Sequence, residues 1–300
     1  MTADLPAGES PATASPLDPV PMAPVAPAQR SGRAGRNLPA AVAVALVLGA
    51  VVLLSLYLWK VAFLGVIVVA IVLGLWELTG ALAGGRISVP VVPMLIGAGA
   101  MLVAAYAGGA EPLMVALVLT CLAVVVWRLT DGFDGLARDV TAGIFASLYV
   151  PFLAGFAALM LRASDGPDRV VVFIVLVVLS DVGGYAAGVL LGRHPMAPSV
   201  SPKKSWEGFA GSAVFAAVGG AIIVSLLVHG AAWQGALIGL AVMAAATVGD
   251  LGESMIKRDL GIKDMGSLLP GHGGIMDRLD SLLPAAPVAY LLLAWLVTGT

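Results

Sequence analysis

About nine apolar segments, each close to 20 residues long, recur along this 300-residue chain and leave it few ways to fold. A helix needs about 20 apolar residues to cross the hydrocarbon core of a bilayer. Hydrophobic residues make up 60% of the chain and charged residues only 11%, whereas a soluble domain is about half apolar and about a quarter charged. We therefore predict an all-α, polytopic integral membrane bundle of about nine transmembrane helices.

The predicted spans follow from the apolar runs and from the polar breaks between them. We expect the first break at Trp59 and Lys60, and the end of the second span just before Glu77. Residues 1–37 are rich in Pro, Ala, Ser and Gly without apolar periodicity, which predicts a disordered tail. One membrane domain, residues 38–300, is expected after it. The predicted spans are 38–56, 57–76, 89–106, 112–127, 140–161, 170–191, 209–228, 231–248 and 282–297.

The basic residues predict the orientation of the bundle. If the N-terminus lies in the cytoplasm, 13 of the 16 Lys and Arg residues fall on the cytoplasmic side. Cytoplasmic loops of membrane proteins carry such an excess. We therefore expect a multi-pass protein of the cell membrane (inner or plasma membrane) with a cytoplasmic N-terminus. The single cysteine, Cys121, lies inside an apolar run, so neither a disulfide framework nor a thiolate metal site is expected.

The stretch 249–281 holds much of the charge of the chain and lies between two predicted spans. Ionisable groups beside hydrocarbon are costly and are therefore usually functional. Carboxylate oxygens bind Mg²⁺ and basic side chains neutralise phosphate, so this mixture suits phosphate chemistry. The alternative is a surface loop whose acids and bases only pair with one another and contact lipid headgroups. The acids are Asp250, Glu253, Asp259, Asp264, Asp277 and Asp280, and the bases are Lys257, Arg258, Lys263 and Arg278.

We predict that this stretch folds as helix, loop and helix. Asp250, Glu253 and Lys257 recur at i, i+3 and i+7 and therefore share one helical face. Gly261 is a suitable helix stop, because glycine adopts the left-handed conformation at little cost. The turn at 270–274 places three glycines around one histidine, and their backbone N–H groups can approach an anion closely.

An acidic residue lies inside the sixth predicted span. Asp181, Tyr185, Gly188 and Gly192 are spaced i, i+4, i+7 and i+11, which places them on one helical face. One interpretation is a functional site, since intramembrane acids usually mark one. The other is a packing face, on which small residues allow close helix approach and Asp181 hydrogen-bonds across the bundle.

A basic cluster precedes the seventh span. Residues 193–208 include three prolines, so a continuous helix is not expected there. The adjacent Lys203 and Lys204 would attract anionic phosphate at a membrane surface. Paired lysines at the end of a span also serve simply as a positive-inside topology anchor.

Together these segments resemble the phosphatidate cytidylyltransferase family, the CDP-diacylglycerol synthases. Residues 181–192 are similar to the D-x3-Y-x2-G-x3-G pattern of the family, and 201–208 to its S-P-K-K-[ST]-x-E-G element. One departure is Val189, where the family usually has a base, so that phosphate contact is either absent or supplied by Arg193. The longest match is the signature Ser254, Ile256, Lys257-Arg258, Lys263-Asp264, Gly266, Leu269-Pro270, His272-Gly273-Gly274-Ile275 and Asp277-Arg278-Leu279-Asp280.

The resemblance implies that CTP and phosphatidic acid react to give CDP-diacylglycerol and pyrophosphate, a step of phospholipid biosynthesis. It implies Mg²⁺, and allows a second cation, with Asp250 and Asp277 as the first candidate ligands and Glu253 and Asp280 as the next. The expected catalytic residues are Asp250, Asp277, Lys257, Arg278 and His272. The expected substrate-binding residues are Ser201, Lys203, Lys204, Arg258, Lys263, Gly273, Gly274, Asp181 and Tyr185.

The expected partners are CTP, phosphatidic acid and membrane lipid, without nucleic acid. Small-residue pairs such as Gly183-Gly184 and Gly219-Gly220 allow helices to associate, and a homodimer is a further expectation. Two other functions remain open from the residues. One is a CTP-dependent polyprenol or phytol kinase, which transfers the γ-phosphoryl group to a lipid alcohol. The other is an ion-coupled membrane transporter whose Asp181 binds the ion.

Overall fold

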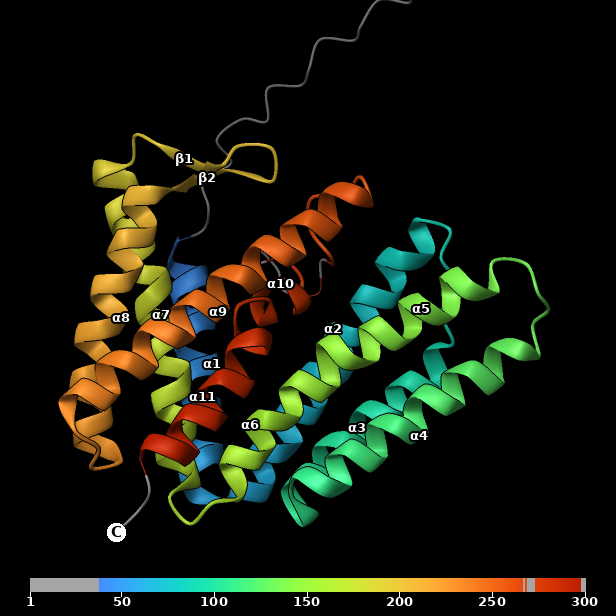
Figure 1. Ribbon diagram of the computed structural model, residues 1–300, viewed down its shortest axis with the longest axis horizontal. Coiled ribbons are helices and arrows are strands. Elements are labelled where there is room, and N and C mark those ends of the chain that lie inside the picture. Colours follow the sequence, from blue (N-terminus) through green and yellow to red (C-terminus); the bar gives the residue numbers. More distant parts are fainter. Residues whose placement is uncertain (1–37, 267, 269–272, 298–300) are drawn as a thin grey trace, which may run out of the picture.

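The computed structural model describes residues 38–266, 268 and 273–297, and gives only the backbone of residues 38–46 and 48 (Figure 1). The predicted tail, residues 1–37, lies outside the described residues. The elements are α1 (Leu38–Leu58), α2 (Lys60–Gly84), α3 (Val91–Gly108), α4 (Ala110–Leu129), α5 (Leu136–Ser147), η1 (Leu148–Phe152), α6 (Leu153–Arg162), α7 (Gly166–Leu191), β1 (Pro195–Ala197), β2 (Ser201–Ser205), α8 (Trp206–Leu227), α9 (Ala232–Asp259), α10 (Met276–Leu279) and α11 (Leu282–Leu296).

The prediction of an all-α polytopic membrane bundle is confirmed. Eight helical segments in the described part are long and apolar enough to cross a membrane: α2, α3, α4, α5 with η1 and α6, α7, α8, α9, and α10 with α11. The first predicted span forms α1, a helix of 21 residues. The break at Trp59 is confirmed, because this residue is the N-cap of α2 and has an extended backbone.

The helices form two groups that meet at the C-terminal end of the chain. α3 packs against α2, α4 and α6, whereas α8 packs against α7 and α9. α11 contacts both α9 and α6 and so joins the two groups (Figure 1). The glycine pairs named above allow close packing between helices of the same chain. A Cβ on Gly183 would lie 2.8 Å from the carbonyl oxygen of Gly211 on α8, and one on Gly220 would lie 2.2 Å from that of Gly235 on α9. The homodimer therefore stays a prediction without support from these pairs.

One predicted end is wrong, and the error concerns the site. α2 does not stop before Glu77 but continues to Gly84, because the residues that follow Glu77 are apolar or small and sustain the helix. α9 extends past residue 248, the end of the predicted span, to Asp259, as the helical spacing of Asp250, Glu253 and Lys257 predicts, so one helix contains both the apolar span and the first acids of the polar stretch. Gly261 follows with φ of 68°, as expected of a helix stop.

The proline-rich segment before α8 forms an antiparallel hairpin, β1 with β2, the only strands among the described residues. Glu207 closes its base. The Oε2 atom of Glu207 accepts hydrogen bonds from the backbone N–H groups of Arg193 (3.1 Å) and His194 (3.2 Å). Ser205 caps α8 by accepting from the N–H of Gly208 at 3.1 Å. The hairpin that presents Lys203 and Lys204 is thus held to the start of α8.

Candidate active site

A polar cavity of about 230 Å³ lies between α7, the hairpin, the start of α8 and α9. Residues that are far apart in the sequence line it together: Asp181, Tyr185 and Gly188 of α7, Lys203 and Lys204 of β2, and Asp250 of α9. The predicted helical face of α7 therefore points into a polar cavity. Ser201 and Arg193 do not line this cavity, although both belong to the same hairpin region.

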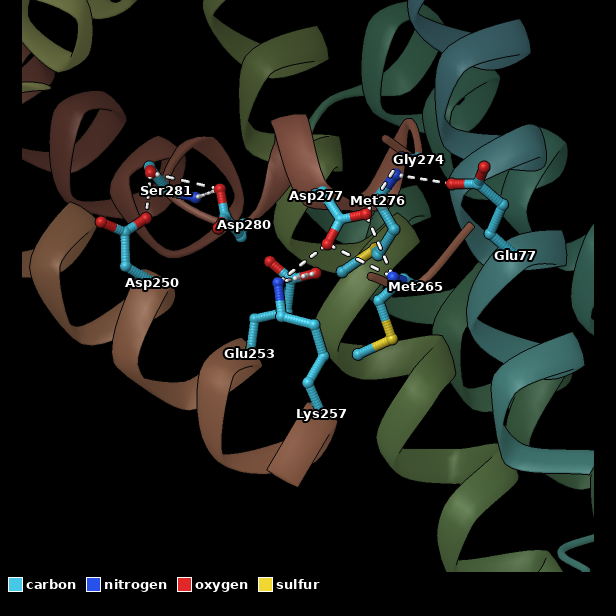
Figure 2. Close-up of polar contacts among 10 residues, drawn as sticks. All are labelled: Glu77, Asp250, Glu253, Lys257, Met265, Gly274, Met276, Asp277, Asp280 and Ser281. Atoms are coloured by element: carbon cyan, nitrogen blue, oxygen red, sulfur yellow. Dashed lines mark hydrogen bonds and ion pairs between the residues drawn. The ribbon is translucent and has the colours of Figure 1, made fainter. Parts of the chain in front are cut away.

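Asp250 links the cavity to the start of α11. The Nζ atom of Lys204 lies 2.7 Å from its Oδ2 atom, and the hydroxyl of Ser281 donates to its Oδ1 atom. The same hydroxyl lies 3.3 Å from Oδ1 of Asp280, whose oxygen also accepts from the N–H of Ser281 at 2.8 Å. Ser281 therefore bridges two carboxylates, as Figure 2 shows. The bridge brings Asp250 and Asp280 to one place.

Glu253 lies one turn beyond Asp250 and is fully buried. Both of its carboxylate oxygens lack a hydrogen-bond partner among the described residues. The nearest cation is the Nζ atom of Lys257, 3.4 Å from Oε1. A buried carboxylate without hydrogen bonds is costly unless another group completes its environment. Glu253 is therefore available to a ligand that enters beside Asp250 and Asp280.

Asp277 binds backbone groups on both sides of the loop between α9 and α10, which we call the signature loop. Its Oδ1 atom accepts from the Nζ atom of Lys257 at 2.8 Å, and its Oδ2 atom accepts from the N–H groups of Met265 (3.1 Å) and Gly274 (3.0 Å). These contacts join α9, the loop after it and α10 (Figure 2). A metal bond to Asp277 would have to displace or share them. Direct metal ligation by Asp277 stays a prediction.

The other predicted residues lie on the elements around these contacts. Arg258 donates from Nε to the carbonyl oxygen of Val200 at 3.4 Å, which ties the end of α9 to the hairpin turn. Lys263 and Arg278 are exposed, on the loop and on α10 respectively. Gly273 has φ of 80°, a conformation that favours glycine. His272 lies outside the described residues, so its predicted role is neither supported nor contradicted.

Besides Ser281, sequence reasoning missed Glu77 in this region. Glu77 is 5% exposed, and its Oε2 atom accepts from the N–H of Met276 on α10 at 2.9 Å. Figure 2 shows it reaching the signature loop from α2, on the side away from Asp250. The signal was present in the sequence, because Glu77 is the only Asp or Glu within the apolar residues 60–84. An acid in such a run is functional by default.

The donor set suits a Mg²⁺ ion that arrives with a phosphate ligand. No three His, Cys, Asp or Glu side chains of the described residues are close enough together to hold a metal by themselves. Magnesium is typically bound by one or two carboxylates together with substrate phosphates and water, rather than by a full protein cage. Two bridged carboxylates with the unpartnered Glu253 beside them fit that pattern.

Comparison with known proteins finds relatives that match nearly the whole chain. The model of the cytidylyltransferase family matches residues 39–296. The chain belongs to this family. It is 40% identical to a phosphatidate cytidylyltransferase of Mycobacterium leprae, over 97% of this chain and 99% of that protein. A phosphatidate cytidylyltransferase of Mycobacterium tuberculosis is also 40% identical, over 90% of this chain and 86% of that protein.

A third relative shows a shorter match. A phosphatidate cytidylyltransferase of Brucella suis is 41% identical over 47% of this chain and 54% of that protein. Membership of the cytidylyltransferase family makes this multi-pass membrane protein a nucleotidyltransferase. The predicted resemblance is thereby confirmed, and the transporter interpretation receives no support.

Proposed function

We propose that this chain transfers the cytidylyl group of CTP to phosphatidic acid, giving CDP-diacylglycerol and pyrophosphate. The observation that carries the proposal is the cavity that Lys203 and Lys204 line together with Asp250 and Asp181. It belongs to a chain whose relatives over nearly its full length are phosphatidate cytidylyltransferases. The cavity offers cations for phosphate and carboxylates for a metal at one place.

In this reaction an oxygen of the lipid phosphate attacks the α-phosphorus of CTP. A new P–O bond forms, and the bond from the α-phosphorus to the bridging oxygen of the β-phosphate breaks, with pyrophosphate taking the electron pair. The lipid phosphate is already ionised near neutral pH, because the second pKa of such a monoester is about 6. No protein nucleophile is required, and catalysis depends on positioning and charge neutralisation.

The basic residues neutralise two anionic substrates as they approach each other. Lys203 and Lys204 line the cavity itself. We assign to them the phosphates nearest Asp250, and to the more peripheral bases the remaining phosphate charge, since like charges would otherwise oppose the attack. The peripheral bases are Arg258, Lys263 and Arg278. Tyr185 and Asp181 are proposed to contact the substrate from α7.

Asp250 and Asp280 are our preferred ligands of Mg²⁺, and Glu253 is the third candidate. Asp277, which the sequence predicts as a ligand, remains a fourth candidate. When bound, Mg²⁺ would supply Lewis-acid stabilisation of the phosphate charge that develops on the leaving pyrophosphate. Ser281 would orient the two carboxylates through its hydroxyl. A second cation is compatible with the number of acids.

Lys257 and Asp277 are proposed to stabilise the arrangement of the acidic residues and of the signature loop. Lys257 contacts both Glu253 and Asp277, at 3.4 and 2.8 Å. Its charge offsets two carboxylates that lie close to each other at a membrane-embedded helix end, which would otherwise repel. Asp277 in turn accepts from the N–H of Gly274, the last residue of the Gly-rich stretch 270–274, which is proposed to approach a phosphate.

We propose that the active site faces the cytoplasm. Lys204 contacts Asp250, so the hairpin and the signature lie at one end of the bundle. The excess of Lys and Arg predicted for the cytoplasmic side supports this orientation. CTP is a cytoplasmic nucleotide, which agrees with an active site on that face of the cell membrane.

The test uses purified full-length protein in detergent with phosphatidic acid, Mg²⁺ and CTP labelled at the α- or the γ-phosphate. We expect α-label in a CMP-bearing lipid with stoichiometric pyrophosphate. Asp250→Asn is expected to form much less product at the Mg²⁺ concentration that saturates the wild type. Label only from the γ-position on an added lipid alcohol would overturn the proposal in favour of a kinase. Absence of lipid labelling by monodisperse protein would also overturn it.

A further inference from the structure

Glu77 is a buried carboxylate that the reaction described above does not use. It lies on α2, a helix long and apolar enough to cross a membrane, and is 5% exposed. It does not line the polar cavity. A carboxylate at such a position carries a large desolvation cost. One hydrogen bond to the N–H of Met276 is its contact with α10, and its Oε1 atom has no partner among the described residues.

Two glycines of the signature leave room for this carboxylate. A Cβ on Gly266 would lie 2.1 Å from Oε1 of Glu77, and a Cβ on Gly274 would lie 2.6 Å from Oε2. Real Cβ atoms essentially never approach another atom within 3.0 Å. The backbone of the loop thus approaches Glu77 on both sides more closely than any side-chain-bearing residue would permit.

The same short segment is held from the other side by Asp277. Glu77 accepts from the N–H of Met276, while the neighbouring Asp277 accepts from the N–H groups of Gly274 and Met265. The carboxylates of Glu77 and Asp277 thus accept from N–H groups two residues apart, those of Met276 and Gly274. The position of Glu77 therefore affects where the Asp277 carboxylate meets Lys257.

We propose that Glu77 is a positioning residue for the nucleotidyl transfer: from α2 it fixes the backbone of the signature loop and thereby the Asp277 carboxylate. Glu77 touches neither substrate nor metal in this proposal and acts through the loop. The inference rests on the proposed function, because its main readout is turnover of CTP. Wild-type protein that forms no CMP-bearing lipid would contradict the proposed function and not this inference.

The first experiment compares Glu77→Gln and Glu77→Ala with Thr79→Val, a control at a residue of the same helix that is 3% exposed. We expect Glu77→Ala to lower kcat by about 10- to 100-fold, the factor for losing a buried hydrogen bond to a charged group. We expect the KM for CTP to change less than about 3-fold, because no substrate contact is removed. Glu77→Gln should recover most of kcat, since its amide oxygen can still accept from Met276.

The second experiment tests whether the glycines and Glu77 act on one element. Gly266→Ala alone should lower kcat because its methyl group meets the carboxylate. In the Glu77→Ala background it should add less than about a 2-fold change, since coupled residues are not additive. Independent effects that multiply would overturn the proposal, as would wild-type kcat in a folded Glu77→Ala variant. Should Glu77→Ala fail to fold, Gly266→Ala in a Glu77→Ser background, whose short side chain also frees the space beside Gly266, carries the same comparison.

Discussion

The ammonium of Lys204 lies 2.7 Å from a carboxylate oxygen of Asp250, although 46 positions separate the two residues in the chain. This pair connects the hairpin before α8 with the polar end of α9. The lysine also lines the cavity proposed for phosphate. Lys204 is thus placed to bind a substrate phosphate while it still contacts a metal-ligand candidate. The adjacent Lys203 lines the cavity without an ion pair to any carboxylate of the described residues.

Lys204→Ala is expected to lower kcat/KM by about 10- to 100-fold, because it removes a charge-assisted contact and leaves Asp250 without its cation. Lys203→Ala is expected to raise the KM for CTP with a smaller effect on kcat. Steady-state kinetics on the purified variants checks both. Lys60→Ala, which removes a lysine bonded to backbone at the other side of the bundle, is the control. Equal effects of Lys203→Ala and Lys204→Ala would contradict the prediction.

Asp250→Asn and Asp280→Asn are each expected to raise the half-saturating Mg²⁺ concentration at least about 10-fold, because each removes a charged oxygen ligand. Ser281→Ala should give a smaller increase, since it only loosens the bridge between them. The measurement is activity as a function of free Mg²⁺. Asp259→Asn, at an exposed acid on the same helix, should leave the requirement unchanged. An unaltered Mg²⁺ requirement in both variants would show that neither Asp250 nor Asp280 is a ligand of the metal.

Glu207→Ala is expected to loosen the hairpin without unfolding the bundle. The substitution leaves the N–H groups of Arg193 and His194 without their acceptor. Trypsin should then cleave after Lys203 or Lys204 about 10-fold faster, and the KM for CTP should rise, while the midpoint of thermal unfolding stays near that of the wild type. Glu111→Ala, at an exposed acid on α4, serves as the comparison. Unchanged cleavage would show that Glu207 is not what closes the hairpin.

Asp139→Ala is expected to destabilise the protein rather than alter its chemistry. Asp139 is 1% exposed, and its Oδ2 atom accepts from Nη2 of Arg128 at 3.0 Å, while its Oδ1 atom accepts from the N–H of Ser88 at 3.2 Å. Leaving Arg128 buried without its partner should cost about 3–5 kcal/mol of unfolding free energy. Thermal unfolding in detergent measures this loss, with Asp131→Ala, at an exposed residue of the loop before α5, as control. A stable but inactive Asp139→Ala protein would contradict the structural role.

The sequence was sufficient for the membrane bundle and for the local elements that carry the candidate site, because both depend on local patterns. Apolar runs of membrane length predicted the bundle, and the spacing of Asp181, Tyr185 and Gly188 predicted a shared helical face. The helix, loop and helix of the signature followed from Gly261 and from the spacing of acids on α9. Each of these inferences needs only the neighbours of a residue in the chain.

What could not be predicted depends on contacts between distant elements. Residue type alone does not tell whether Asp277 binds a metal or orders a loop, since that depends on its distances to Lys257, Met265 and Gly274. Glu77 looked like a helix boundary because acids commonly end apolar runs. Its burial is explained only by α10, which lies far along the chain.

The contact between Glu77 and Met276 also bears on how the molecule is assembled. It joins residues 199 positions apart, so the second helix enters the bilayer long before its partner has been synthesised. Until then the carboxylate has no loop to hold, and the nascent bundle keeps an uncompensated polar group at membrane depth. Synthesis of the last span supplies the N–H of Met276 to the Oε2 atom of Glu77 and completes the signature in one event. A chain that stops short of α10 therefore lacks both activity and the contact that relieves Glu77, which would mark it for quality control as an incomplete membrane protein.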